Sequence, residues 1–151
     1  MATMIALTAA IATSAQAQTV GRASFAPASM GVINVADDYG GYIASYMDRI
    51  DGIRAKRTPV AITGDCRSAC TLYLGAGNVC VTRSATLRFH GPSKSGTPFP
   101  QTQFDTFSKM MARYYPEPIK NWFMTKARYR INGTYAVSGA ELIRLGIPEC
   151  G

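Results

Sequence analysis

The stretch that decides the fold runs from residue 58 to residue 90 and reads TPVAITGDCRSACTLYLGAGNVCVTRSATLRFH. Its β-branched start, residues 58–63, predicts a strand, and a turn is expected at residues 64–67. The apolar run Ser68–Gly75 predicts a buried helix. Residues 85–90 alternate apolar and polar side chains, which predicts a second strand that ends at His90. This order of elements predicts a βαβ unit with parallel strands.

The flanking sequence extends the same alternation. The run at residues 30–35 predicts a strand, and residues 36–41 predict a turn that ends in Gly40-Gly41. Residues 42–56 predict a helix, because isoleucine and methionine recur there at helical spacing. Residues 30–151 are therefore expected to form a single α/β domain, built of βαβ units with a mainly parallel sheet.

The second half of the chain predicts three more helices and one long loop. Residues 91–101 are rich in Gly, Pro and Ser, and we expect a mobile flap that follows His90 directly. An amphipathic helix is expected around residues 104–114, and another after Pro118. A capping box at residues 138–141 predicts a last short helix that stops near Gly146.

The N-terminus has the features of an export signal. Residues 1–17 carry no charged side chain and end in Ala15-Gln16-Ala17, a cleavage pattern typical of a secretory signal peptide. No Lys or Arg precedes the apolar run, and an Ala-rich disordered terminus is the alternative. Residues 18–29 are expected to form a flexible leader. We expect a secreted or periplasmic bacterial protein, and no later segment is long and apolar enough to span a membrane.

The four cysteines indicate disulfides rather than a metal site. Cys66, Cys70, Cys80 and Cys150 form an even set, which favours two disulfides in an exported protein. Their spacings do not match paired zinc knuckles, and His90 is the only histidine. No metal and no cofactor are expected.

The net charge of +7 is concentrated in one segment. Six Lys or Arg side chains fall between residues 109 and 130, with Glu117 the only acid there. Such a face is compatible with an anionic partner, but a solvated helix surface is the favoured interpretation and no nucleic-acid motif accompanies it. We therefore expect no nucleic-acid partner.

Three strand ends deliver groups that suit acyl transfer. In open α/β folds, functional groups gather beyond the carboxyl ends of the strands. A serine needs a base to become a nucleophile, and histidine is the usual base near neutral pH. Ser68 and His90 are the candidates for these two roles. Backbone amides of Ala69 and of Gly40 or Gly41 are the candidate oxyanion-hole donors.

These segments, in this order, resemble the Clp protease proteolytic subunit and its secreted relatives in the ClpP/crotonase superfamily. The resemblance rests on four stretches: residues 33–41 with Gly-Gly, GDCRSA at 64–69, LRFHGP at 87–92, and VSGAE at 137–141 with LGI at 145–147. It covers nearly the whole chain after residue 32. It implies a ClpP/crotonase-like fold with Ser68 as nucleophile and His90 as base.

The resemblance also exposes a departure. The family's triad aspartate lies four residues before the late serine, and that position is Thr134 here. No acid lies between Glu117 and Glu141. Thr134, or alternatively Asn132, is the candidate to accept a hydrogen bond from His90 Nδ1–H, as neutral groups do in some triads.

The cysteine pairing follows partly from spacing and partly from the resemblance. Cys66 and Cys70 are four residues apart, a helical spacing that suits a disulfide. The resemblance implies a terminal strand near the start of the His90 strand, which favours Cys80–Cys150. A Cys70–Cys80 disulfide is the rival pairing.

Three functions remain open. The leading hypothesis is a secreted serine hydrolase that cleaves a peptide or an ester. The second is a non-catalytic exported module that binds a peptide or a cell-envelope partner. The third is a crotonase-like acyl-thioester enzyme. This hypothesis is the weakest, because an exported protein would rarely meet coenzyme A. A homo-oligomer is compatible with the sequence but is not implied by it.

Overall fold

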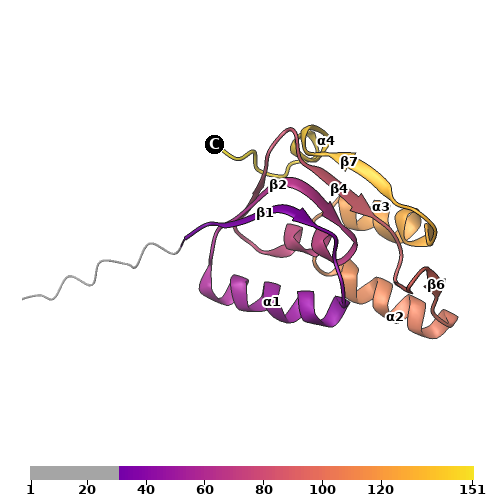
Figure 1. Ribbon diagram of the computed structural model, residues 1–151. Helices are drawn as coiled ribbons and strands as arrows, with labels where there is room; N and C mark the ends of the chain where they lie inside the picture. Colours follow the sequence, from indigo (N-terminus) through magenta and orange to yellow (C-terminus); the bar gives the residue numbers. More distant parts are fainter. Residues whose placement is uncertain (1–30) are drawn as a thin grey trace, which may run out of the picture.

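The computed structural model describes residues 31–151. The predicted signal peptide, the leader and Met30 lie outside these residues and stay predictions. The described part is one α/β domain, as expected (Figure 1). Its strands are β1 (Ile33–Asp38), β2 (Val60–Arg67), β3 (Val79–Val81), β4 (Thr86–Phe89), β5 (Ser93–Lys94), β6 (Thr97–Pro98) and β7 (Tyr135–Ser138).

The helices lie between these strands. They are α1 (Ile43–Lys56), the 3-10 helix η1 (Ser68–Gly75), α2 (Gln101–Ala112), α3 (Ile119–Thr125), the 3-10 helix η2 (Ala127–Tyr129) and α4 (Gly139–Arg144). The predicted helices after Tyr42, Pro118 and Ser138 are confirmed. The Ser138 hydroxyl caps α4 by accepting a hydrogen bond from the Glu141 amide at 3.2 Å, as the capping box predicts.

The sheet is mostly parallel, which confirms the sequence prediction. Its order is β1-β2-β4-β7, with β3 also paired to β2. β2 runs parallel to β1, β3 and β4, and only β7 is antiparallel to its neighbour β4. β3 and β4 therefore pair with successive parts of β2: β3 with its beginning and β4 with its carboxyl end.

The two faces of the sheet differ in polarity. In Figure 1, α1 runs beneath β1 and β2, and its buried side chains join those of β2 and η1 in one core. The core includes Ile50, Ile62, Cys66, Leu72 and Leu87, all fully buried. Because side chains alternate along a strand, Asp65 and Arg67 point to the opposite face, where Arg88 lies beside them. That face is polar and partly exposed.

Two predicted turns belong to strands, which corrects the sequence analysis. β1 continues through residues 36–38, and β2 continues through residues 64–67. Gly64 explains the error, because a Cβ there would lie 1.7 Å from the Ala36 carbonyl oxygen. The register shifts between Val35 and Asp37 at the same place. The glycine therefore allows close strand approach at an irregularity in the ladder rather than a turn.

Four short strands were also missed by sequence reasoning. Cys80 lies in a short strand of its own, β3, which the sequence did not indicate. β7 precedes the last helix in a stretch of only four residues. Within the predicted loop, β5 and β6 form a hairpin whose turn residues Ser95 and Gly96 both have positive φ. Strands this short carry too few residues for a periodic signal.

Candidate active site

Ser68 occupies a sharp turn at the carboxyl end of β2. It is the first residue of η1, directly after the strand ends at Arg67. Its φ is +55°, a left-handed conformation that is uncommon for a residue with a side chain. A serine on a strained strand-to-helix turn is typical of nucleophiles in α/β hydrolytic enzymes. Within residues 31–151 no side chain or backbone group bonds its hydroxyl.

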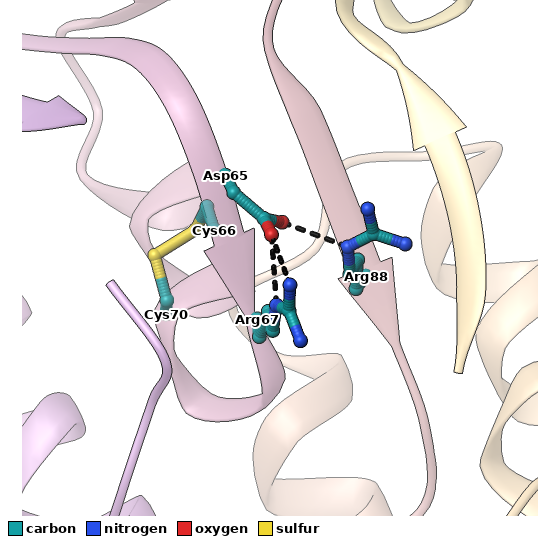
Figure 2. Close-up of polar contacts among 5 residues, drawn as sticks. All are labelled: Asp65, Cys66, Arg67, Cys70 and Arg88. Carbon is teal, nitrogen blue, oxygen red and sulfur yellow. Dashed lines mark hydrogen bonds and ion pairs between the residues drawn. A yellow bond between two sulfur atoms is a disulfide. The ribbon is translucent and has the colours of Figure 1, made fainter. Parts of the chain in front are cut away.

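The turn around Ser68 is held in place by residues of the hydrophobic core. Cys66 and Cys70 form a disulfide across Ser68, with their Cα atoms 5.4 Å apart (Figure 2). Both cysteines and Ala69 are fully buried. The Thr71 hydroxyl donates a hydrogen bond to the Ser68 carbonyl at 2.7 Å. The backbone on both sides of Ser68 is therefore anchored in the interior.

The Gly40-Gly41 loop lies against this turn. A Cβ at Gly40 would lie 2.6 Å from the Arg67 carbonyl oxygen, 2.8 Å from Ser68 Cβ and 2.9 Å from the Ala69 nitrogen. With φ at +80°, only glycine fits here without strain. The loop is therefore within contact distance of the predicted nucleophile.

Asp38 distinguishes the two glycines. Its carboxylate accepts hydrogen bonds from the Gly40 amide at 2.9 Å and from the Tyr46 hydroxyl. Burial, together with the Asp38 hydrogen bond and charge, raises the pKa of Tyr46, so that the phenol remains a donor. The Gly40 N–H is already engaged, whereas the Gly41 N–H has no acceptor among the described residues. Of the two candidate donors, Gly41 is the free one.

Ala69 supplies the other candidate donor. It is the second residue of η1, where a backbone amide has no acceptor within the helix. Its N–H has no other backbone acceptor within residues 31–151. Free amides at Gly41 and Ala69 match the requirement of an oxyanion hole, and whether their N–H vectors converge stays a prediction.

His90 follows the neighbouring strand at the same edge of the sheet. β2 and β4 are parallel, and their last paired residues are Arg67 and Arg88. Ser68 is one residue beyond this pair and His90 is two beyond it. Because paired strands lie about 4.8 Å apart, both residues leave the sheet at one place. The sequence prediction that they reach the same edge from adjacent strands agrees with this register.

The hydrogen bond of His90 Nδ1 sets its tautomer. Nδ1 lies 2.7 Å from the Gly91 carbonyl oxygen, which accepts only, so Nδ1 carries the proton in the neutral ring. The lone pair is then on Nε2. The Gly91 amide in turn donates to the Arg130 carbonyl at 2.9 Å, which holds the acceptor in place.

This arrangement differs from the expected role of Thr134 or Asn132. Thr134 and His90 each lie one residue beyond the last pair of the antiparallel ladder of β4 and β7, in which Phe89 pairs with Tyr135. However, the Nδ1 partner is the Gly91 backbone rather than either side chain. Every residue has a backbone carbonyl, so the sequence could not indicate that this one would be the partner of Nδ1.

A cavity lies beside the Gly41 loop. Its volume is about 580 Å³, and its walls come from the loop and the start of α1 on one side and from the β5–β6 hairpin and α2 on the other. The lining residues are Gly41, Tyr42, Ile43, Ala44, Ser93, Lys94, Ser95, Phe99 and Phe107. The predicted flap therefore forms one wall of the cavity, while its mobility stays a prediction.

Sequence reasoning missed a charged cluster at the same end of the sheet. Asp65 accepts hydrogen bonds from Arg67 Nε and Arg88 Nε, both at 2.8 Å (Figure 2). These bonds lower the pKa of Asp65, although burial of its carboxyl acts in the opposite direction and is the largest single influence. The alternation of Asp65 and Arg67 along β2 was the available signal.

The described residues contain no group of three or more His, Cys, Asp or Glu side chains that could hold a metal ion. All four cysteines are in disulfides, Cys66–Cys70 and Cys80–Cys150, which is the favoured pairing. Within residues 31–151, no helix is long and apolar enough to cross a membrane.

Comparison with known proteins adds no assignment. No model of a protein family matches the chain. No curated protein matches it at a significant level either.

Proposed function

We propose that this chain is an exported serine hydrolase of ClpP/crotonase-like fold that cleaves peptide or ester bonds. The single observation that carries the proposal is Ser68 itself, held with φ at +55° at the end of β2. It lies against a glycine loop and one strand away from the only histidine of the chain. The two disulfides are consistent with an oxidising compartment, and export is part of the proposal.

In the proposed reaction, Ser68 Oγ attacks the substrate carbonyl carbon while its proton passes to His90 Nε2. The Nδ1–H bond to the Gly91 carbonyl leaves the Nε2 lone pair free for this transfer. The imidazolium then protonates the leaving amine or alcohol as the bond to carbon breaks. Water hydrolyses the resulting acyl-enzyme by the same steps, with His90 as base for the water.

The oxyanion of each tetrahedral intermediate would be bound by the amides of Gly41 and Ala69. Asp38 supports the loop by binding the Gly40 amide, which leaves the next amide for the substrate. Donors fixed before the reaction stabilise developing charge without reorganisation. The cavity lined by Gly41 offers room for the substrate next to one of these donors.

The absence of an aspartate at His90 Nδ1 predicts a slow enzyme. A neutral carbonyl fixes the tautomer but stabilises the imidazolium less than a carboxylate would. We therefore expect turnover of activated esters to be easier to detect than cleavage of peptides.

The test is hydrolysis of p-nitrophenyl butyrate by the oxidised protein and three variants. Ser68→Ala should reduce hydrolysis to the background rate, and His90→Gln should reduce it by about 10²–10⁴-fold. Ser45→Ala, an exposed serine on α1, is the matched control and should leave the rate unchanged. Equal rates for wild type and Ser68→Ala would overturn the proposal and favour a binding module.

A further inference from the structure

The face of the sheet opposite α1 carries two arginines directly opposite each other. Arg67 on β2 and Arg88 on β4 are paired in the parallel ladder. Like charges in such a position repel one another. Asp65 offsets the repulsion by accepting from the Nε atoms of both, so that the three side chains together keep one net positive charge.

The bonding leaves one guanidinium edge open. Arg67 uses Nε and Nη2 on the same Asp65 oxygen, whereas Arg88 uses only Nε, on the other oxygen. Within residues 31–151, Nη1 and Nη2 of Arg88 bond no other group. Figure 2 shows them directed away from Asp65. The residue paired with Arg88 on β7 is Ala136, which is exposed and adds only a methyl group beside the guanidinium.

The position of Arg88 connects it with the candidate active site. Arg88 lies on β4, two residues before His90, which is about 7 Å along an extended chain. Arg67 directly precedes Ser68. The Arg88 side chain is 32% exposed and Asp65 is 20% exposed, so the open edge is fixed by a partly buried partner yet accessible to a ligand.

We propose that Arg88, oriented by Asp65 and assisted by Arg67, binds a carboxylate of the substrate. A fixed guanidinium edge with two N–H donors matches the two oxygens of a carboxylate. The net charge of +7 would attract such substrates. The inference rests on the proposed hydrolase function and deepens it: the substrates are peptides or esters with a free carboxylate a few bonds from the scissile carbonyl.

The test compares a neutral ester with an anionic one of similar length. Wild type and Arg88→Gln are assayed with p-nitrophenyl butyrate and with mono-p-nitrophenyl glutarate. In Arg88→Gln, kcat/KM for the glutarate ester should fall by about 10- to 100-fold, mainly through KM, since a charge-assisted bidentate contact is lost. For the butyrate ester, kcat/KM of Arg88→Gln should stay within about twofold of wild type. For the glutarate ester, kcat/KM of Arg88→Lys should lie between those of wild type and Arg88→Gln, because lysine keeps the charge but lacks the two parallel N–H donors of the guanidinium.

Arg83→Gln is the control for net charge. Arg83 is exposed and pairs with Glu149 near the C-terminus, so its loss should not discriminate between the two esters. The inference would be overturned if Arg88→Gln lowered kcat/KM equally for both esters. It would also be overturned if Arg83→Gln lost the preference for the glutarate ester to the same extent as Arg88→Gln.

A binding measurement separates this inference from the proposed function. Glutarate is titrated into wild type and Arg88→Gln, with amide NMR shifts as the readout and no turnover required. Binding at Arg88 that Arg88→Gln abolishes supports the carboxylate site even where neither ester is hydrolysed. Hydrolysis at Ser68 with glutarate affinity unchanged by Arg88→Gln would overturn the carboxylate site alone.

Discussion

The two disulfides lie at opposite ends of β2 and differ in what they hold. Cys66–Cys70 joins residues four apart, is fully buried and brackets Ser68. Cys80–Cys150 joins residues 70 apart. It ties the C-terminal segment to β3, where Val81 donates to the Pro148 carbonyl at 2.9 Å and Cys150 donates to the Val81 carbonyl at 3.0 Å.

This difference separates fold stability from site geometry. A disulfide stabilises mainly by restricting the unfolded chain, so a long loop contributes more than a short one. Cys80–Cys150 is therefore expected to stabilise the whole domain. Cys66–Cys70 closes a small loop and is expected to act chiefly on the conformation of the turn around Ser68. The predictions below test this division.

The largest stability effect is expected from removing the long-range disulfide. Replacing both Cys80 and Cys150 by Ala should lower the free energy of unfolding by about 4 kcal/mol, because about 70 residues of loop are released in the unfolded chain. Urea denaturation followed by circular dichroism gives the value. Ester hydrolysis by the fraction that remains folded should be unchanged. A loss below about 1 kcal/mol would contradict the assignment of this disulfide to global stability.

Gly40→Ala should damage the site more than the fold. The new Cβ would lie 2.6 Å from the Arg67 carbonyl oxygen at a φ of +80°, so the loop must move away from Ser68. We expect a loss of about 2–3 kcal/mol in unfolding free energy and about 10²–10³-fold in kcat.

Gly133→Ala provides the matched control for this substitution. Gly133 has a φ of +76°, but a Cβ there would meet nothing within 4 Å. Its stability loss should be about 1 kcal/mol, with kcat retained. A similar kcat loss in both variants would mean that Gly40 has no special place at the site.

Removing the short disulfide should affect stability less and the hydrolysis rate more than removing the long one. Replacing both Cys66 and Cys70 by Ala should lower the free energy of unfolding by about 2 kcal/mol, as expected for a small closed loop. The hydrolysis rate should fall by about tenfold or more, because a small displacement of the nucleophile is costly. Hydrolysis at the wild-type rate would show that the core alone holds the turn.

Asp65 should give the smallest stability effect, with a defined pH dependence. Its folded-state pKa is lowered by hydrogen bonds from Arg67 and Arg88, although burial opposes them. The stabilisation is therefore present above the unfolded pKa of about 4 and lost as pH falls through the lower folded pKa. In urea titrations, the difference in unfolding free energy between wild type and Asp65→Asn should narrow as the pH falls from neutral through the unfolded pKa of about 4 and below it. A gap that widens toward acid would contradict this ion-pair network.

Much of the architecture follows from residue patterns, but the strand limits do not. The helical spacing of Ile43, Met47, Ile50 and Ile53 predicted α1, and the alternation at 85–90 predicted β4. The predicted strand limits were wrong where glycine was interpreted as a turn signal. Gly64 instead allows β2 to approach β1 closely, which only the tertiary structure shows. Short strands such as β3 and β7 gain their stability from sheet neighbours rather than from their own sequence.

The sequence predicted which residues form the candidate site, but it did not predict the hydrogen bonds that these residues make. Ser68 stood out because it begins a helix after a predicted strand and turn, and His90 stood out because it ends a predicted strand. The partner of His90 Nδ1 is a backbone carbonyl, which residue identities do not specify. The Gly40 amide is bound by the Asp38 carboxylate, and the sequence did not show which of the two glycine amides this side chain takes. The open edge of Arg88 likewise depends on which oxygen of Asp65 each arginine takes.

The most direct test of the central claim is to locate a covalent label. The oxidised protein is treated with a fluorophosphonate, digested and analysed by tandem mass spectrometry, beside the variants Ser68→Ala and His90→Gln. The account predicts one modified residue, Ser68, with strongly reduced labelling in His90→Gln and none in Ser68→Ala. Absence of label from folded wild type, or label on another serine that persists in Ser68→Ala, would contradict it.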